Sequence, residues 1–262
     1  MAAGVGRPLE GQVALVTGSS GDIGGATATR LAELGAAVGV NFHSSEASAR
    51  QILERIQRGG GSGVLLKADV GSEAEVSEMT RRLESELGAP TLLVNNSGYG
   101  ADHNQIENLS VEEWNRVIAT NLTGAFLCTK ALVPGMRKAG RGRIVNVSSI
   151  CGLSGDCEPA YCASKAGILG LTRSTAARLA PVIQVNAVLP GFVSMKYHSE
   201  RKELVKSVAP DGRISDPAEI AELICVLLTL RSTFLTGACI PMDGGASIAS
   251  LGMHMSWVTE RE

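Results

Sequence analysis

The sequence predicts an α/β fold: one doubly wound, seven-stranded parallel sheet with helices on both faces. Three observations predict it: short β-rich runs alternate with longer stretches at helical spacing, the runs are apolar on both faces, and no linker divides the chain. Such strands form parallel sheets that helices cover on both sides, and right-handed crossovers favour double winding. We therefore expect a single domain over residues 1–262, with a flexible start at residues 1–10.

Seven strands are expected to alternate with six helices. The strands are Val13–Val16, Ala37–Phe42, Val64–Lys67, Thr91–Val94, Arg143–Val147, Ile183–Val188 and Ala238–Pro241. The helices are Ile23–Leu34, Glu46–Gln57, Glu73–Leu87, Val111–Arg137, Ala160–Leu179 and Pro217–Leu230. Because ligands of such sheets bind beyond the carboxyl ends of the strands, the loops that follow strands are where we expect the chemistry.

Composition excludes several classes of function. The chain of 262 residues is 44% hydrophobic, and its 24 basic and 26 acidic side chains give a formal charge of −2. That balance gives no electrostatic footprint for nucleic acid or an anionic membrane, and 3% aromatic residues offer little for base stacking. The longest apolar run, Leu223–Leu228, is far shorter than the roughly 18 residues of a membrane helix.

Cysteine and histidine usage points to a cytoplasmic protein without a metal. The six cysteines include no CxxC pair and no basic-then-apolar leader opens the chain, so we expect free thiols in a reducing compartment. The four histidines are scattered without metal-ligand spacing, so we expect no metal.

A glycine-rich turn follows the first strand. Thr17-Gly-Ser-Ser-Gly-Asp-Ile-Gly24 leads straight into a helix, where glycines let a pyrophosphate approach the helix N–H groups. Such a turn can also be a plain tight connection, but its place in the first βα unit favours a dinucleotide-binding Rossmann fold. The residues expected to contact the cofactor here are Gly18, Ser20, Asp22, Ile23 and Gly24.

The end of the second strand bears on which dinucleotide binds. An acidic residue there would bond the ribose hydroxyls and repel a 2′-phosphate, yet no carboxylate precedes Glu46. Asn41, His43 and Ser44 offer polar donors to a phosphate, which favours NADP(H) over NAD(H). Neither loop contains an Arg or Lys to pair with that phosphate, and His43 could equally be a solvated surface side chain.

Three polar features further along fit one reaction. Tyr161 and Lys165 share a helix face at i and i+4, where the ammonium would lower the pKa of the phenol. Ser149 ends the fifth strand, where a hydroxyl could hold a substrate carbonyl. Asn121 lies within the long fourth helix. Each has an ordinary alternative, as a surface pair, a turn serine or a helix-bend residue, but their joint order on this fold makes chance a poor explanation.

With these features, the chain resembles the short-chain dehydrogenase/reductase family over nearly its whole length. The resembling motifs are Thr17-Gly…Gly24, Asp69-Val70, Asn95-Asn-Ser-Gly98, Asn121, Ser149, Tyr161/Lys165, Pro190-Gly191 and Asp243-Gly-Gly245. The resemblance implies that Tyr161 is the general acid and that Lys165 lowers its pKa and binds the nicotinamide ribose. It also implies that Ser149 orients the carbonyl and that Asn121 holds a water of a proton relay.

The resemblance extends the expected cofactor contacts and shows some departures. Further contacts implied are Asp69 and Val70 at the adenine, Asn96, Ser97 and Gly98 along the cofactor, and Pro190, Gly191 and Val193 at the nicotinamide. Asp22 stands where the family usually has glycine and could cap the helix, Ser97 replaces the usual alanine, and Met195 stands where many members have threonine. Residues 191–216 are short for the family and imply a short substrate lid.

The motif style is similar to that of 3-oxoacyl-[acyl-carrier-protein] reductases and polyketide ketoreductases. This implies an NADP(H)-dependent reductase of a small-molecule or carrier-bound ketone, and a homo-oligomer, tetramer or dimer. Arg137, Lys138, Arg141 and Arg143 could dock an acidic carrier or form a solvated face, and Tyr99 and His103 could line the pocket. The alternatives are an NAD-dependent dehydrogenase of a polyol or steroid alcohol, and a non-catalytic dinucleotide-sensing module.

Overall fold

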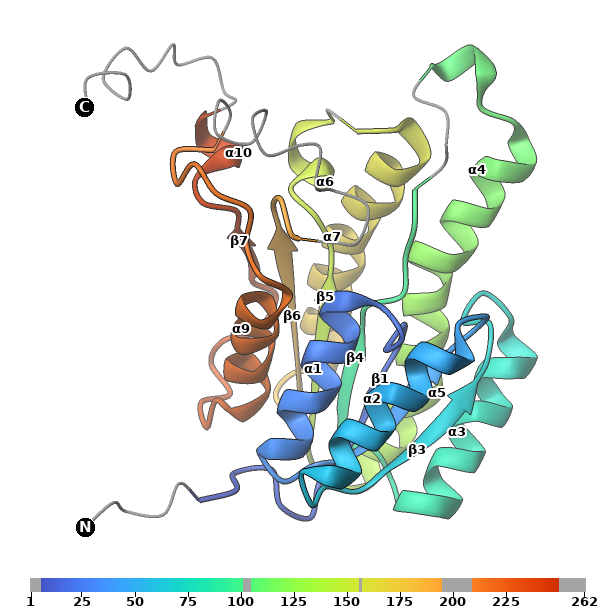
Figure 1. The fold of residues 1–262 in the computed structure, drawn as a ribbon, viewed down its shortest axis with the longest axis vertical. Helices are drawn as coiled ribbons and strands as arrows, with labels where there is room; N and C mark the ends of the chain where they lie inside the picture. The colour runs from blue at the N-terminus through green and yellow to red at the C-terminus, as the bar shows by residue number, and fades with distance from the viewer. Residues whose placement is uncertain (1–5, 101–104, 156, 195–208, 250–262) are drawn as a thin grey trace.

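The computed structural model describes residues 6–100, 105–155, 157–194 and 209–249 and contains one parallel sheet (Figure 1). The strands run in the order β3-β2-β1-β4-β5-β6-β7, and each neighbouring pair is parallel. Their bounds are β1 (Val13–Val16), β2 (Ala37–Phe42), β3 (Gly63–Lys67), β4 (Leu92–Asn95), β5 (Gly142–Val147), β6 (Ile183–Pro190) and β7 (Cys239–Met242). The predicted doubly wound α/β fold is confirmed.

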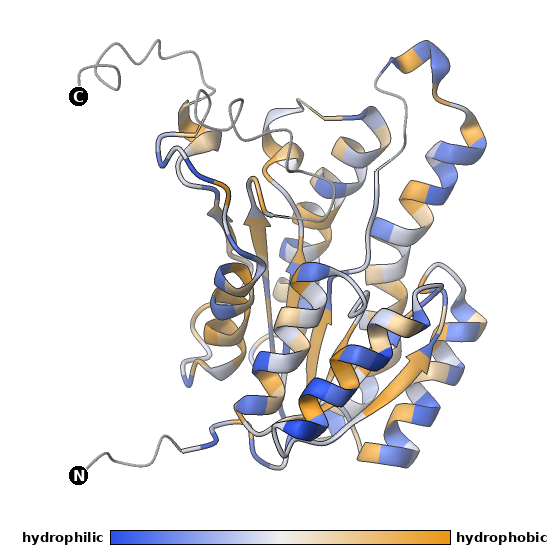
Figure 2. Cartoon of the chain, in the orientation of Figure 1, coloured by the Kyte–Doolittle hydropathy of each residue, from blue (hydrophilic) through white to orange (hydrophobic). Residues whose placement is uncertain are grey.

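Helices cover both faces of the sheet. The longer ones are α1 (Asp22–Glu33), α2 (Glu46–Arg58), α3 (Glu73–Leu87), α4 (Val111–Ile118), α5 (Gly124–Lys138), α7 (Pro159–Leu179) and α9 (Pro217–Thr229). The core on one face includes residues of α1, α2 and α9, and the core on the other includes residues of α3, α5 and α7. Figure 2 shows the strands between them mostly in the colour of hydrophobic residues.

Alternation along β1 explains why the strands are apolar throughout. Ala14 and Val16 belong to the core with α1 and α9, whereas Val13 and Leu15 belong to the core with α3 and α5. Successive side chains of a strand point to opposite faces, so a strand covered on both sides is buried at every position. All of β1 is indeed buried.

The order of the strands places a crevice between β1 and β4. The chain runs outward from β1 through β2 to β3, and then returns to the other side of β1 with β4. Loops that follow β1 and β4 therefore diverge to opposite faces, and ligands of α/β sheets bind at such a switch point.

Predicted and observed bounds agree to within two residues, with one exception. The expected single helix Val111–Arg137 is divided into α4 and α5 by a π-helical segment, Ala119–Thr123. Apolar periodicity does not reveal one turn with an extra residue, although such turns are frequent at functional sites. Three short helices also escaped prediction because a single turn has no periodicity: η1 (Ile106–Asn108), α6 (Cys151–Ser154) and α10 (Ala246–Ala249).

The short apolar runs indicated no segment long enough to cross a membrane, but the helical stretch Val111–Lys138 is long enough. By length and composition it is apolar enough to cross a membrane, although 44% of its most apolar 18-residue segment is buried inside the protein. Within it, α5 packs against α3, β4 and β5. Buried core helices of soluble proteins have the same composition, so this stretch is weak evidence of a membrane span.

One pair of cysteines is not free, contrary to expectation. Cys151 and Cys157 form a disulfide with their Cα atoms 5.8 Å apart, a usual separation for such a bond. The turn of α6 brings the two together, which spacing in the sequence does not reveal. Cys128 and Cys225 are buried free thiols, and burial raises the pKa of each to about 12.

A chain of buried amides and hydroxyls ties the sheet to two helices. The Asn95 amide on β4 donates to Asn146 Oδ1 on β5 at 2.8 Å and to Thr129 Oγ1 on α5 at 3.2 Å. The Asn146 amide in turn donates to Thr172 Oγ1 on α7 at 2.9 Å. Buried polar groups that lose such partners bear their full desolvation penalty.

We expect Asn146→Ala to lower the free energy of unfolding by about 1–3 kcal/mol, because it leaves the buried Asn95 amide and Thr172 hydroxyl short of a partner. Urea unfolding would measure this. Asn115→Ala, on the exposed surface of α4, is the matched control and should change the free energy by less than about 0.5 kcal/mol. Equal losses in the two variants would contradict the role of the network.

Candidate active site

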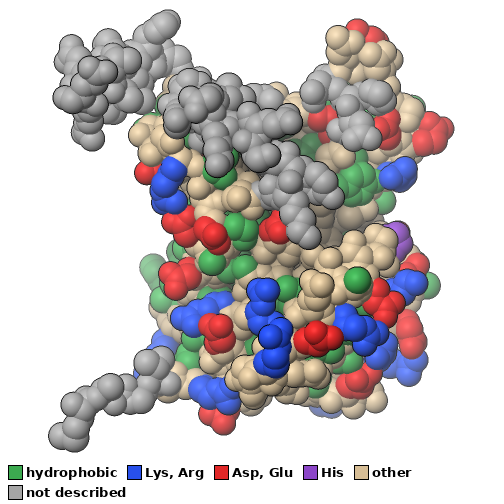
Figure 3. Space-filling model, viewed as in Figure 1, with side chains coloured by type: hydrophobic (Ala, Val, Ile, Leu, Met, Phe, Trp, Pro, Cys, Tyr) green, Lys and Arg blue, Asp and Glu red, His purple; other side chains and the backbone are tan. Residues whose placement is uncertain are grey.

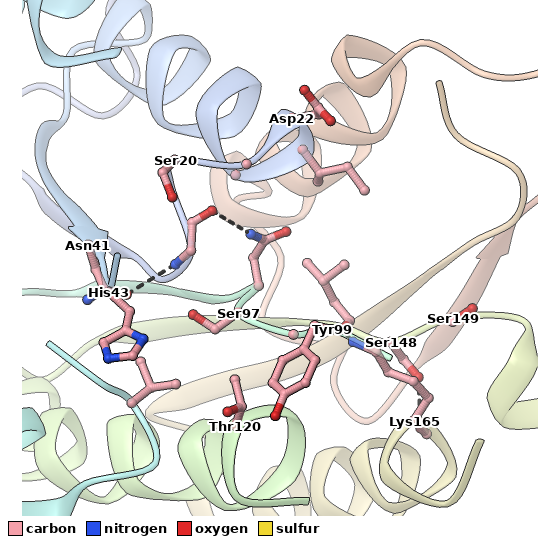
Figure 4. A pocket seen from close by; sticks show the side chains of 18 of the residues that line it. Ser20, Asp22, Asn41, His43, Ser97, Tyr99, Thr120, Ser148, Ser149 and Lys165 are labelled. Carbon is pink, nitrogen blue, oxygen red and sulfur yellow. Dashed lines mark hydrogen bonds between the residues drawn. The ribbon is translucent and has the colours of Figure 1, made fainter. Parts of the chain in front are cut away.

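A cavity of about 470 Å³ lies beyond the carboxyl ends of the strands (Figure 4). Nearly all predicted site residues line it: Gly18, Ser20, Asp22, Ile23, Gly24, Asn41, His43, Ser44, Asp69, Val70, Asn96, Ser97, Gly98, Ser149, Tyr161, Lys165, Pro190, Gly191 and Val193. Asn121 is the one predicted site residue that does not. Tyr99 lines the cavity as suggested, together with Gly21, Ala68, Arg116, Thr120, Val147 and Ser148, which the sequence analysis did not single out.

The turn after β1 requires glycine at two positions. Gly18 has φ +63°, a conformation that side chains with a Cβ rarely adopt. A Cβ at Gly24 would lie 2.4 Å from the Gly18 carbonyl oxygen. These close approaches open the start of α1 toward the cavity.

The first turn of α1 has no side-chain cap among the described residues. Its N-cap is Gly21, and Asp22, which could have capped the helix, is instead the first helical residue. The first N–H groups of a helix need acceptors, and phosphate groups are common ones. This turn therefore fits the pyrophosphate of a dinucleotide, with the Asp22 carboxylate nearby in the cavity wall.

The Asn41 side chain is hydrogen-bonded to main-chain groups, contrary to its expected role as a hydrogen-bond donor to a phosphate. It is buried, its Oδ1 accepts from the Gly18 N–H at 3.1 Å, and its amide donates to the carbonyls of Leu66 and Ala68. Both amide hydrogens are thus used within the protein. His43 and Ser44 remain exposed in the cavity wall.

The loop after β4 is bound to the turn after β1. The Asn96 amide donates to the carbonyls of Thr17 and Gly18 at 3.0 and 3.2 Å. The Thr17 hydroxyl accepts from the N–H groups of Asn96 and Ser97. The two halves of the crevice are therefore held in one arrangement.

Tyr161 and Lys165 project from the first turns of α7. Glu158 caps this helix, since its carboxylate accepts from the N–H groups of Ala160 and Tyr161. Pro159 follows at the first helical position, where proline is favoured. The sequence analysis missed Glu158, although an acceptor side chain directly before a proline is a usual helix start.

The side chains of Ser149, Tyr161 and Lys165 gather at one end of the cavity. The Ser149 hydroxyl lies close enough to the Tyr161 phenol to act on its pKa, and it accepts from the Cys151 N–H at 3.2 Å. Lys165 Nζ lies 5.4 Å from the centroid of the Tyr161 ring and donates to the Val147 carbonyl at 3.0 Å.

Burial sets the ionisation of this group. It raises the pKa of Tyr161, while the nearby Ser149 hydroxyl acts in the opposite direction. Burial also lowers the pKa of Lys165 to about 8. Desolvation of the phenolate thus opposes the expected effect of Lys165 on Tyr161, which stays a prediction, and Tyr161 is a neutral phenol at neutral pH.

Asn121 lies behind the cavity wall, in the π-helical segment. Its side chain is buried, with Oδ1 accepting from the Tyr99 N–H at 3.0 Å and the amide donating to the Tyr99 carbonyl at 2.9 Å. The amide also donates to Ser164 Oγ on α7 at 3.0 Å. Asn121 thus joins the loop after β4 to α7.

Two further cavity residues, Arg116 and Thr120, precede Asn121 on the same helical stretch. A pattern of polar residues at i and i+4 could have indicated them. Met195, His103 and much of the expected lid lie outside the described residues. Within the described parts of the chain, no group of three or more His, Cys, Asp or Glu side chains is placed to hold a metal ion.

Comparison with known proteins gives the same picture over almost the whole chain. A family described as enoyl-(acyl carrier protein) reductase matches residues 18–247. The chain is 37% identical over 243 residues to the 3-oxoacyl-[acyl-carrier-protein] reductase FabG of Pseudomonas aeruginosa, which covers 90% of this chain and 98% of that protein. It is also 37% identical over 241 residues to the 3-oxoacyl-[acyl-carrier-protein] reductase of Synechocystis sp., with 90% and 97% covered.

Solved structures agree with this picture. A putative short-chain dehydrogenase/reductase from Burkholderia xenovorans superimposes with a TM-score of 0.84 at 33% identity, over 90% of this chain and 98% of that one. A putative short-chain alcohol dehydrogenase from Sinorhizobium meliloti gives a TM-score of 0.86 at 33% identity, over 92% and 98%. With the family match, these relatives show that the chain belongs to the short-chain dehydrogenase/reductase family of oxidoreductases.

Proposed function

We propose that this protein is an NADP(H)-dependent reductase that converts a 3-oxoacyl or polyketide-type ketone to a secondary alcohol. The observation that carries the proposal is the cluster of Ser149, Tyr161 and Lys165 in a cavity whose far end fits a pyrophosphate. The relatives named 3-oxoacyl-[acyl-carrier-protein] reductases support the substrate class. We further propose that the chain acts as a single domain in a cytoplasmic homo-oligomer.

Tyr161 is the proton donor in this proposal. As a neutral phenol beside Ser149, it can donate to a carbonyl oxygen that also accepts from the Ser149 hydroxyl. A nicotinamide dinucleotide, when bound, supplies the hydride. Positioned proton transfer of this kind contributes about 10²–10⁴-fold to a rate.

Lys165 supports the phenolate that remains after proton transfer. Its ammonium is buried near the Tyr161 ring and donates to the Val147 carbonyl, which leaves further donors for a ribose hydroxyl. It carries its charge below about pH 8. Asn121 positions Tyr99 and α7 through its side chain, and a relay water at Asn121 stays a prediction.

The surface charge does not distinguish a carrier-bound ketone from a small one. On the face drawn in Figure 3, basic and acidic side chains are interspersed rather than separated into patches of one sign. Arg143 is partly buried and donates to the Ser232 carbonyl, so it contributes less to a docking surface than its place in the sequence indicated. A small ketone therefore remains as suitable a substrate as a carrier-bound one.

The rival reading is an NAD-dependent dehydrogenase of a polyol or steroid alcohol. One observation favours it: Asn41 has no hydrogen left for a 2′-phosphate. A dinucleotide sensor without catalysis would have no use for the Tyr161 phenol beside Ser149 and Lys165.

We expect Tyr161→Phe to lower ketone reduction by about 10²-fold or more, because the proton donor is lost, while the affinity for NADPH stays unchanged. Consumption of NADPH over a panel of a β-ketoacyl thioester, a bicyclic ketone, a steroid ketone and a sugar ketone would measure it. NADH serves as the cofactor control, and fluorescence titration measures binding. Undiminished turnover by the variant would refute the mechanism, and faster turnover with NADH would favour the rival.

The pH dependence of the reverse reaction tests the role of Ser149. Alcohol oxidation needs the phenolate of Tyr161, so its kcat/KM should rise with pH as Tyr161 ionises. The Ser149 hydroxyl opposes the effect of burial on the pKa of Tyr161. Ser149→Ala should therefore raise that pKa further and move the rise to higher pH.

The neighbouring Ser148 provides the matched control for this measurement. Its hydroxyl donates to the Lys165 carbonyl at 2.8 Å rather than to the Tyr161 phenol. Ser148→Ala should leave the pH of the rise where it is. A shift to lower pH in Ser149→Ala, or the same shift in both variants, would contradict the assignment.

A further inference from the structure

Two basic side chains, Lys165 and Arg116, line the cavity. Lys165 is buried beside Tyr161 and serves the reaction proposed above. Arg116 stands on α4 at the exposed mouth, and the reduction of a ketone gives it no task. We propose that Arg116, oriented by Tyr99, recognises a phosphate group that enters this cavity; the inference rests on the proposed function and extends it.

Arg116 has no carboxylate partner among the described residues. Some other arginines of the described residues, namely Arg30, Arg50, Arg81, Arg82 and Arg213, form ion pairs with Asp or Glu, whereas Arg55 on the exposed surface forms none there. Arg116 makes one side-chain hydrogen bond, from Nε to the Tyr99 hydroxyl at 3.2 Å. Its Nη groups therefore have no hydrogen-bond or ion-pair partner among the described residues and are left as donors beside the cavity.

Tyr99 holds the guanidinium in a defined orientation. The Arg116 guanidinium carbon lies 5.8 Å from the centroid of the Tyr99 ring, within the range of a cation–π contact. The main chain of Tyr99 is in turn bound on both sides by the Asn121 amide. A side chain that is oriented before binding loses less conformational entropy when a ligand arrives.

Arg116 lies on the same helical stretch as other residues near the cavity. Thr120, one turn further along the same helical stretch, also lines the cavity. The adjacent Ala119 packs near Gly71, directly after the Asp69-Val70 pair. Figure 4 shows Thr120 and Tyr99 between His43 on one side and Ser148 and Lys165 on the other.

The chemistry of a guanidinium at this place selects phosphate. Its planar fork binds phosphate oxygens through parallel N–H donors, with geometry that an ammonium cannot reproduce. Neither the turn after β1 nor the loop after β2 contains an Arg or Lys, and Asn41 is already occupied. Among the described residues that line the cavity, Arg116 is thus the exposed guanidinium that a phosphate can meet.

Two ligands could carry that phosphate: NADP(H), through its adenosine 2′-phosphate, or a thioester substrate such as acetoacetyl-CoA, through its diphosphate or 3′-phosphate. For the first, the dissociation constants of NADPH and NADH are measured by fluorescence titration. Arg116→Gln should weaken NADPH by roughly tenfold, as expected for loss of one charge-assisted contact, and leave NADH unchanged. For the second, KM is compared between acetoacetyl-CoA and its N-acetylcysteamine analogue, which has no phosphate.

Three further variants make the test specific. Arg116→Lys keeps the charge without the fork and should recover only part of the loss. Tyr99→Phe keeps the ring but removes the hydroxyl that accepts from Nε, and should weaken the same phosphate-bearing ligand by a smaller factor. Arg55→Gln, an exposed arginine of α2 outside the cavity, is the matched control and should change neither ratio.

A selective loss in either arm supports the proposal and identifies the source of the phosphate. Unchanged ratios in both arms overturn it, as does an equal loss for NADPH and NADH together with equal rises in KM for both thioesters. The proposed function fails separately. A protein that binds NADPH through Arg116 but shows no turnover dependent on Tyr161 would refute the reductase alone, and Tyr161-dependent turnover with unchanged ratios would refute the role of Arg116 alone.

Discussion

The arrangement of the site depends on the close contact between the turn after β1 and the loop after β4. Asn96 donates to the carbonyls of that turn, the Thr17 hydroxyl accepts from the loop, and Asn41 holds the Gly18 N–H from below. A Cβ at Gly24 would lie 2.6 Å from the Asn96 amide nitrogen as well as 2.4 Å from the Gly18 oxygen. Since these loops leave the sheet toward opposite faces, their contact keeps a cavity open between them and sets the start of α1 against it.

Burial of charge is the second constraint. Lys165 is only 4% exposed, and within the described residues its ammonium has one hydrogen-bonding partner, the Val147 carbonyl. Its pKa of about 8 measures how strongly the surroundings disfavour the charged form. An acidic ligand or a phenolate at Tyr161 would relieve that penalty, so the same burial that costs stability makes the charge available to the reaction. Strained or poorly solvated groups of this kind are typical of active sites.

Hydrogen bonds through Asn121 and Tyr99 join α7 to Arg116 at the cavity mouth. They run from Ser164 on α7 to Asn121 in the π-helical segment, from Asn121 to the main chain of Tyr99, and from the Tyr99 hydroxyl to Arg116. The π segment matters here because it sets Asn121 inward between α4 and α5. One asparagine thereby positions both the loop that carries Tyr99 and the helix that carries Tyr161.

The strands, the main helices and most residues of the cavity wall could be predicted from the sequence, because apolar alternation and glycine-rich turns are local patterns in the order of residues. The sequence also indicated Ser149, Tyr161 and Lys165, because Tyr161 and Lys165 are four residues apart on one helix and Ser149 lies just after a strand. The ionisation of these groups depends on the tertiary structure, because the raised pKa of Tyr161 follows from its burial by other elements. The same holds for Asn41, whose amide donates to β3 and to the residue after it, and for the Cys151–Cys157 bond. It also holds for Arg116, which forms no ion pair among the described residues and instead donates to Tyr99.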